Sequence, residues 1–341
     1  MGLENVVTKE YMRENTVFAD AFNYLIYDGR AVLDPEKLHE MDATELAVLD
    51  HLQDNGKKKD LSGVEKQRDV LKSAVIKEDD KAAYVILGIE NQTDIHYAMP
   101  VRNMIYDALQ YGRQVTDISA KHRANKGDSK DASRAEYLSG FYKEDKLLPV
   151  ITMVIHFGAD EWDGPLSLHA MMKTKDETIL SFVQNYQIHL IDPAKMGQKD
   201  LEKLSSSLRE VLGYIKYSKD KEQLLKFIDN NPRMRMEASA AKVIQAVTST
   251  KIEIPENAEV VDVCKAVKDL MEDSREEGRE EGIKKGREEG RQEGREEGRK
   301  QGQIETLAGL VLDGKLDIKI AAVSAGMTVQ EFETEMEKMK R

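Results

Sequence analysis

The stretch 68–92, RDVLKSAVIKEDDKAAYVILGIENQ, constrains the fold most strongly, because it has the pattern of a β-hairpin. Its first arm carries the apolar residues Val70, Leu71, Val75 and Ile76. Its second arm, 82–92, is rich in the β-branched and aromatic residues that strands favour. The polar residues 77–81 separate the arms and predict the turn. We therefore expect a sheet built around this pair of strands.

Two acidic residues, Asp69 and Glu90, lie at the open end of the predicted hairpin. A turn centred between residues 79 and 80 places them directly opposite each other, with Cβ atoms about 4.5–5.5 Å apart. Gln92 follows Glu90 by two residues, so both side chains project from the same face of the strand. Two carboxylates this close would repel each other. A shared divalent cation is one physical reason to keep them together, since one or two carboxylates with waters and substrate phosphate typically hold Mg²⁺.

This arrangement resembles the PD-(D/E)XK nuclease superfamily and, within it, the Rpn-type recombination-promoting nucleases, also called PD-(D/E)XK family transposases. Three segments and, more weakly, a glycine repeat at 278–302 carry the resemblance: RDVLKSAV (68–75), YVILGIENQTDIHYAMPVRNMIYDALQY (84–111) and LPVITMVIHFGADEWDGPLSL (148–168). The resemblance implies an α/β fold with a restriction-endonuclease-like mixed-sheet core.

The implied activity is a metal-dependent DNA endonuclease that uses Mg²⁺ (or Mn²⁺ or Ca²⁺). By resemblance, Asp69 and Glu90 would ligate the metal, and the backbone carbonyl of Asn91 would be a further ligand. Gln92 stands in the position usually held by Lys, where it would orient water or phosphate by hydrogen bonds. A Gln cannot place a positive charge beside the phosphate, so this chain departs from the superfamily pattern there.

A helix is expected to begin at Pro100. The resemblance implies that it packs behind the metal-binding strand. Arg102 and Tyr106 follow helical spacing along its more polar edge. The planar guanidinium of Arg102 suits a phosphate or a carboxylate, so Arg102 is a candidate clamp for substrate phosphate, with Tyr106 beside it. A structural salt bridge is the alternative for Arg102.

The departure at Gln92 and the acidic composition leave a second function open, namely a weak or inactive member of the same fold that binds DNA or protein. The formal net charge is −12, which argues against a basic surface that binds nucleic acid by bulk electrostatics. A third, weaker alternative is an assembly protein that associates through its C-terminal segment.

The composition predicts a cytoplasmic protein. The single cysteine, Cys264, excludes an intrachain disulfide, and the start of the sequence has no signal-peptide pattern. No stretch approaches the 18 uncharged apolar residues of a membrane span. No membrane contact is therefore expected, and DNA is the partner that the family resemblance implies.

Apolar periodicity predicts the remaining elements in the order helix, hairpin, helix, two strands and a helical series. These elements are a helix at 8–27, a short helix within 35–50, strands at 147–157 and 186–191, and helices at 198–217, 219–230, 234–248 and 259–273. A loop is expected at 54–66 and a flexible, basic excursion at 117–136. Asp20 on the first helix is either a further acid of the site or part of a solvated face. The sole Trp, Trp162, is interpreted as packing over the core.

We expect four parts along the chain: a nuclease-like domain (1–230), a helical extension (231–274), a charged segment with glycine at every fourth position (275–303) and a small helical module (304–341). The charged segment has nine Lys or Arg and nine Glu, so it is neutral. Its glycines predict a marginal exposed helix or a flexible linker, since each costs about 1 kcal/mol relative to Ala. Self-association through the C-terminal segment is a possible use.

Overall fold

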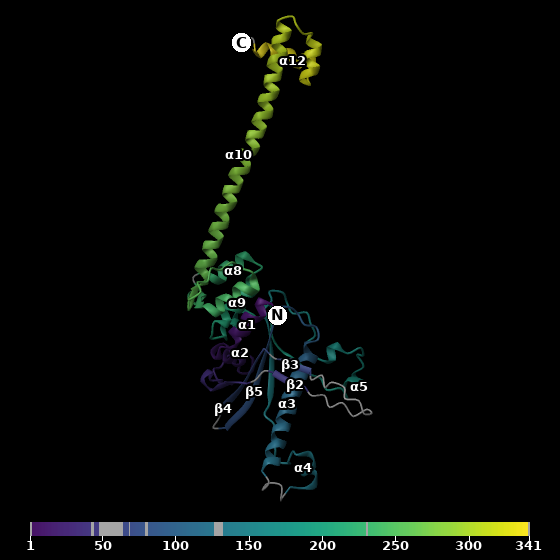
Figure 1. Cartoon of the computed structure of the whole chain (residues 1–341), viewed down its shortest axis with the longest axis vertical. Coiled ribbons are helices and arrows are strands. Elements are labelled where there is room, and N and C mark those ends of the chain that lie inside the picture. The colour runs from purple at the N-terminus through teal and green to yellow at the C-terminus, as the bar shows by residue number, and fades with distance from the viewer. Residues whose placement is uncertain are drawn as a thin grey trace. The chain divides into compact units, whose positions relative to one another are not determined.

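The computed structural model describes residues 2–41, 44–47, 64–67, 69–78, 81–125, 132–229 and 231–339. The chain forms two compact units, Met1–Val267 and Lys268–Arg341 (Figure 1). The first unit contains the sheets, and the second is helical. None of the helices in these ranges is both long enough and apolar enough to cross a membrane.

The first unit is built on a five-stranded sheet with the strand order β1-β4-β5-β6-β7. Its strands are β1 (Leu38–Glu40), β4 (Val70–Glu78), β5 (Lys81–Gln92), β6 (Val150–His156) and β7 (His189–Ile191). β1, β4 and β5 pair antiparallel, whereas β5, β6 and β7 pair parallel. The prediction of an α/β protein with a mixed sheet is thus confirmed. Two small antiparallel sheets pair β2 (Thr44–Ala47) with β3 (Val64–Gln67) and β8 (Arg235–Glu237) with β9 (Val260–Asp262).

The predicted hairpin is formed by β4 and β5, in the expected register. Val70 pairs with Ile89 at the open end, and Glu78 pairs with Lys81 at the closed end. The two turn residues between Glu78 and Lys81 lie outside the described residues. Asp69 immediately precedes β4, so the observed pairing brings it opposite Glu90.

Helices cover both faces of the five-stranded sheet (Figure 1). On one face, Tyr111 of α3 (Met99–Ala124) packs against Leu71, Ile86 and Val150. On the other face, Lys72 of β4 reaches α1 (Leu3–Arg13) and α2 (Asn15–Tyr27), and its ammonium lies 5.0 Å from the centre of the Phe18 ring. We call these the α3 face and the α1 face. Directly opposed residues of β4 and β5 share a face, and successive residues alternate.

The single helix expected at 8–27 is wrong, because the chain breaks at Glu14 into α1 and α2. Glu14 has an extended backbone, with φ −62° and ψ 123°. Lys72 donates hydrogen bonds to the Arg13 carbonyl and to the Asn15 side chain on either side of the break. A buried cation from the sheet thus satisfies the carbonyl that the break exposes.

Two predicted connections are also corrected. Residues 35–50 contain a short 3-10 helix, η1 (Pro35–Lys37), followed by β1 and β2, since residues 38–40 pair with the edge of β4. The last residues of the predicted loop at 54–66 belong to β3. The segment 117–136 is largely helical: α3 continues to Ala124 and α4 spans Arg134–Ser139, while residues 126–131 lie outside the described ranges.

The second predicted strand, 147–157, is confirmed as β6, between β5 and β7. It is buried over nearly its whole length, as its apolar sequence indicates. The strand expected at 186–191 is shorter, because only His189–Ile191 pairs with β6, while Gln187 forms an isolated bridge with Ser167.

The helical series expected after residue 198 is present with other boundaries: the first helices are shorter than predicted, and the last one is much longer. It consists of α6 (Gln198–Glu202), α7 (Leu208–Tyr217), α8 (Lys221–Ile228), α9 (Ala238–Thr248) and α10 (Val263–Leu312). Short helices elsewhere are α5 (Glu177–Leu180), η3 (His169–Met171), η4 (Pro193–Lys195) and η5 (Pro232–Met234). The predicted helix 198–217 is interrupted because the buried carboxylate of Asp20 accepts hydrogen bonds from the backbone N–H groups of Ser205 and Ser206.

The second unit consists of most of α10 with α11 (Ile318–Ala325) and α12 (Val329–Met339). The charged segment 275–303 is helical throughout, as part of α10. The end of α10 packs with α11 and α12 around a small core, whose most buried residues are Ile304, Ala308, Ala321, Ala322, Phe332 and Met336. Thr328 begins α12 with a capping box, in which it exchanges hydrogen bonds with Glu331.

Candidate metal and phosphate site

The candidate site lies at the open end of the β4–β5 hairpin, on the α3 face. The pairing of Val70 with Ile89 puts Asp69 across from Glu90, and Arg102 of α3 reaches Glu90 from above this face. Two acids predicted to share an ion are therefore brought together by the fold, with a guanidinium beside them.

Asp69 is partly buried and held by one backbone hydrogen bond. The N–H of Asn91 donates to its Oδ2 atom over 2.8 Å. Burial raises the pKa of Asp69, and the Asn91 hydrogen bond and the positive charges of Lys9 and Arg102 oppose that rise. Asp69 is thus a carboxyl whose charged form is disfavoured until a cation compensates for the lost water.

Glu90 has a fully buried side chain that is paired with a cation. Its Oε2 atom lies 3.1 Å from Nη2 of Arg102, whose side chain is 33% exposed. Nε of Arg102 donates to the Tyr106 hydroxyl over 3.2 Å. Burial works to lower the pKa of Arg102, but the charge of Glu90 and the contact with Tyr106 outweigh it, and the pKa is raised.

Tyr106 completes this cluster one helical turn after Arg102. Burial, then the charge of Glu90, raises the pKa of the Tyr106 phenol, and Arg102 opposes the rise. The hydroxyl is therefore protonated at neutral pH. The structure thus contains the salt bridge that was one of the two sequence interpretations of Arg102. A third of the Arg102 side chain stays exposed to solvent.

The side chain of Gln92 is hydrogen-bonded to the backbone of Asn91. The side-chain amide of Gln92 donates to the Asn91 backbone carbonyl over 2.8 Å, and the backbone carbonyl of Gln92 accepts from the N–H of Phe157 over 2.7 Å. The carbonyl proposed as a metal ligand thus already accepts one hydrogen bond. A carbonyl has two lone pairs, so this bond leaves room for one more partner.

The oxygen donors at the site fit a hard divalent cation. Carboxylate and carbonyl oxygens are the ligands that Mg²⁺ and Ca²⁺ prefer, and Mg²⁺ needs only one or two carboxylates. Within the described ranges, no group of three or more His, Cys, Asp or Glu side chains could hold a metal ion. The site therefore suits a cation that completes its shell with water or phosphate.

Asp20 and Trp162 are not part of this site. Both oxygens of Asp20 bind Ser205 and Ser206, so it is neither a site acid nor part of a solvated face. Trp162 is 2% exposed and donates from its ring N–H to the Gly164 carbonyl, which confirms its packing role.

Two polar features of α3 were missed from the sequence. Asp107 accepts hydrogen bonds from Thr152 over 2.5 Å and from the Tyr186 hydroxyl over 2.6 Å, which fixes the helix to the sheet behind the site. Asn103 is fully buried, and its amide has no hydrogen-bond partner among the residues that the structure describes. The sequence signal that could have revealed them is the four-residue spacing of Asn103 and Asp107, which places both on the same side of the helix.

The comparisons with known proteins add one match. A family model with the description "Putative transposase, YhgA-like" matches residues 43–243. That range contains the hairpin, α3, β6 and every residue of the candidate site. Neither a curated protein nor a solved structure matches the chain.

Proposed function

This chain belongs to the YhgA-like family, and from that premise we propose that it is a Mg²⁺-dependent DNA endonuclease with a restriction-endonuclease-like core. The observation that carries the proposal is the meeting of Asp69 and Glu90 at the end of a mixed sheet, beside Arg102. The transposase description of the family supports a role in moving or rearranging DNA.

Asp69 and Glu90, with the Asn91 carbonyl, would hold the metal ion. When bound, the ion supplies Lewis-acid stabilisation of the negative charge that develops on the phosphate. The raised pKa of Asp69 supports this assignment, because a cation at the site favours the charged carboxylate that burial disfavours.

Arg102 would bind the substrate phosphate while it stays paired with Glu90. A guanidinium has five N–H donors, and the contacts to Glu90 and Tyr106 occupy only part of this set. The side chain is 33% exposed, so its remaining donors can reach a ligand. Arg102 would thereby supply the positive charge that Gln92 lacks.

Gln92 would orient water or a phosphate oxygen through its amide. To do so it must exchange its hydrogen bond to the Asn91 carbonyl for one to the ligand. Metal binding at the same carbonyl would weaken that bond and release the amide, so the two events favour each other.

A binding protein without nuclease activity is the alternative function. The ion pair between Arg102 and Glu90 favours it, because the guanidinium already neutralises one proposed ligand. Isothermal titration of the protein with Mg²⁺ or Mn²⁺ separates the two functions: binding that is lost in Glu90→Gln supports the nuclease, and no binding to the wild-type protein supports the alternative.

The decisive experiment is a nicking assay on supercoiled DNA with and without Mg²⁺. We expect Asp69→Asn and Glu90→Gln to abolish metal-dependent nicking and to keep the circular dichroism spectrum of the wild type. The matched control is Asp94→Asn, which removes an exposed carboxylate two residues after Gln92 and should leave nicking unchanged. Nicking at the wild-type rate by either site variant would refute the assignment.

A further inference from the structure

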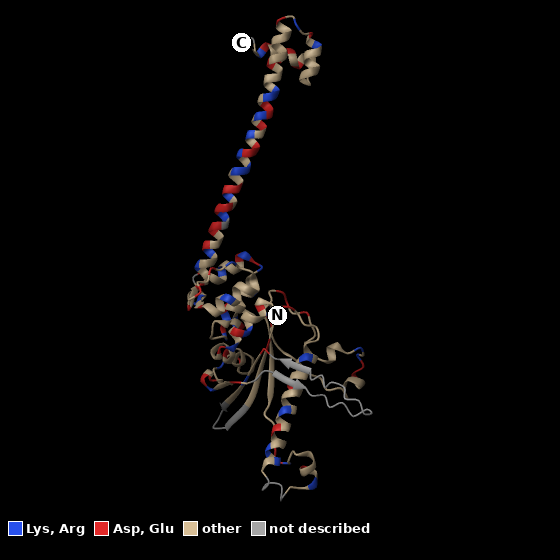
Figure 2. Cartoon of the chain, in the orientation of Figure 1, with Lys and Arg blue, Asp and Glu red and all other residues tan. Residues whose placement is uncertain are grey.

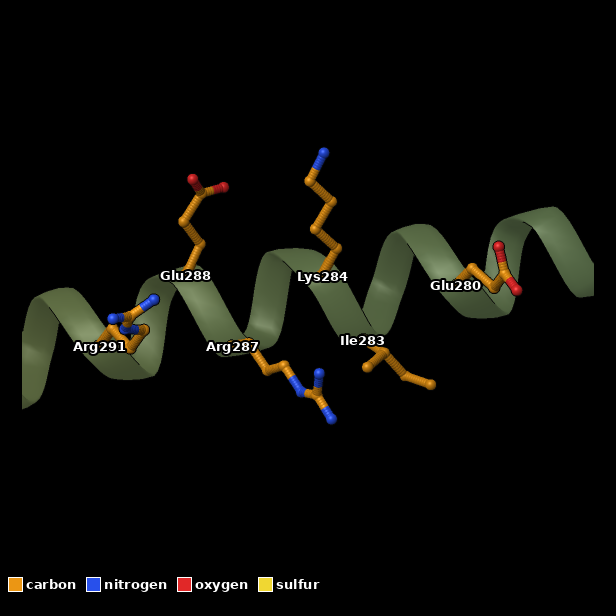
Figure 3. Close-up of a pocket in the computed structure, with 6 residues that line it drawn as sticks. All are labelled: Glu280, Ile283, Lys284, Arg287, Glu288 and Arg291. Carbon is orange, nitrogen blue, oxygen red and sulfur yellow. The ribbon is translucent and has the colours of Figure 1, made fainter.

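The charged helix α10 carries acidic and basic side chains in close alternation (Figure 2). In the close-up of Figure 3, Lys284 and Glu288 are directed to one side of the helix and Arg287 to another. Every described side chain from 275 to 303 is exposed, so solvent and neighbouring charges of the other sign both weaken their fields. The formal net charge of the chain is −12. DNA binding as proposed above therefore depends on individual cations placed near the site.

Lys9 is a cation of this kind, contributed by α1. This helix packs against β4 and β5, at the open end of the hairpin (Figure 1). Thr8, Tyr11 and Met12 form its buried side, and Lys9 lies at the edge of that side, half-buried. A lysine in this position can bury its apolar stem and keep its ammonium at the surface.

The positive charge of Lys9 acts on the carboxyl of Asp69. Two cations oppose the raised pKa of Asp69, and Lys9 has the larger effect, ahead of Arg102. Electrostatic interactions weaken with distance, so the ammonium of Lys9 lies near the Asp69 carboxyl. Arg102 belongs to α3 and Lys9 to α1, which cover opposite faces of the sheet. Asp69 therefore lies between two cations that come from different sides.

No acid in the described part of the chain is in direct contact with Lys9. None of the residues three or four positions away on α1 is acidic: they are Asn5, Val6, Met12 and Arg13. The side chain of Lys9 forms no ion pair or hydrogen bond with any residue that the structure describes. Arg13, by contrast, pairs with Glu40 over 3.2 Å. The three N–H donors of Lys9 are thus available to a ligand.

We propose that Lys9 binds a backbone phosphate of DNA on the α1 side of Asp69, next to the phosphate that Arg102 and the metal ion hold. The proposal rests on DNA being the ligand of the site. An ammonium is a compact charge with rotatable donors, which suits a single phosphate oxygen. Because Asp69 lies between the two cations, each would contact a different phosphate. The DNA strand would then cross the open end of the hairpin from one face of the sheet to the other.

The balance of charge at the site supports a second phosphate. The carboxylates of Asp69 and Glu90 together offset the two positive charges of a divalent ion. Arg102 then offsets the charge of the phosphate at the metal. The charge of Lys9 has no counterpart in this set, whereas the neighbouring phosphate of the same strand carries one negative charge and no cation of its own. Lys9 would thus remove the repulsion between that phosphate and the acidic site.

The first experiment measures how the affinity of the full chain for a DNA duplex depends on salt concentration. Fluorescence anisotropy is recorded with Ca²⁺ in place of Mg²⁺, and a denaturing gel checks that the duplex stays intact. Each neutralised phosphate contributes about 0.9 to the slope of log K against log salt. We expect Lys9→Met and Lys9→Gln to weaken binding and to lower this slope by about 0.9, and Lys9→Arg to keep the slope of the wild type.

The matched control is Arg13→Met, which removes a cation one turn further along the same helix and should leave affinity and slope unchanged. A Lys9→Met variant with the affinity and slope of the wild type would overturn the proposal, as would a wild type that binds no duplex. A wild type that binds the duplex but does not nick DNA with Mg²⁺ would refute the nuclease alone. Lys9 would then be a phosphate contact of a binding protein, provided that Lys9→Met lowers the slope.

The second experiment separates phosphate binding from a structural role beside Asp69. Isothermal titration with Mg²⁺ should show that Lys9→Met binds the ion at least as tightly as the wild type, because a positive charge near a ligand has been removed. Loss of both Mg²⁺ and DNA binding would show a structural role and overturn the proposal. In the nicking assay we expect Lys9→Met to raise KM and to keep kcat. A lower kcat at unchanged KM would place Lys9 at the reacting phosphate instead.

Discussion

Arg102 and Glu90 form an ion pair across the contact between α3 and β5, with Nη2 and Oε2 3.1 Å apart. The carboxylate is fully buried, whereas the guanidinium keeps a third of its surface exposed. One arginine thus neutralises a buried acid and still faces the opening of the site. A substitution of Arg102 should therefore affect both the stability of the fold and ligand binding.

Removing the guanidinium should destabilise the protein. Arg102→Met leaves the buried Glu90 carboxylate without its nearest positive charge, and breaking a buried pair on one side costs about 3–5 kcal/mol. We expect the partial exposure of Arg102 to place the loss near the lower end, about 3 kcal/mol, in urea unfolding. The double variant Glu90→Gln/Arg102→Met should lose less than Arg102→Met alone. Equal losses in both variants would show that the charge pairing contributes little.

Asp69 should make the stability depend on pH in a defined direction. Burial raises the pKa of Asp69 in the folded protein, so the unfolded chain releases this proton more readily. The stabilising contribution of Asp69 is therefore fully present below the ordinary Asp pKa of about 3.9 and is lost as pH rises through the higher folded value.

The metal-free Asp69→Asn variant should consequently be more stable than the wild type at pH 7. Its advantage should shrink as the pH falls toward 3.5. Chemical unfolding at the two pH values measures this difference. For Asp94→Asn, an exposed substitution, we expect a change within about 0.5 kcal/mol at both pH values. If the stability difference between Asp69→Asn and the wild type grew as the pH fell, the raised pKa of Asp69 would be contradicted.

Lys72 should matter for the fold but not for metal binding. It pairs with Leu87 in the hairpin and therefore lies on the α1 face, away from Asp69 and Glu90. Lys72→Ala removes the donor from the Arg13 carbonyl and leaves a cavity, so we expect a loss of about 2–4 kcal/mol. Isothermal titration of the folded variant with Mg²⁺ should give the wild-type affinity. A weakened affinity would place Lys72 in the site.

The hairpin could be predicted from the sequence because its signals are local. A polar turn between two apolar arms fixes the register, and the register alone brings Asp69 to Glu90. The same holds for the N-cap of α12, where Thr328 and Glu331 are three residues apart. The start of the covering helix was also predictable from Pro100, but its buried side is not, because that side carries the polar residues Asn103, Asp107 and Gln110.

The features that were missed depend on partners far away in the chain. The break between α1 and α2 is satisfied by Lys72, which is 59 residues from Arg13. The interruption before α7 is bound by Asp20, which is 185 residues from Ser205. Neither contact can be predicted from the sequence of a single helix. A structural salt bridge of Arg102 was one of two open interpretations, but the sequence did not identify Glu90 as its partner.

The hairpin register has a consequence for insertions and deletions. Side chains alternate between faces with a period of two, so a slip of β4 by one residue would exchange its two faces. Asp69 would then turn toward α1, and Lys72 would come to lie beneath α3 on the side of Glu90. The number of residues between Glu78 and Lys81, at the far end of both strands, thus decides whether Asp69 faces Arg102.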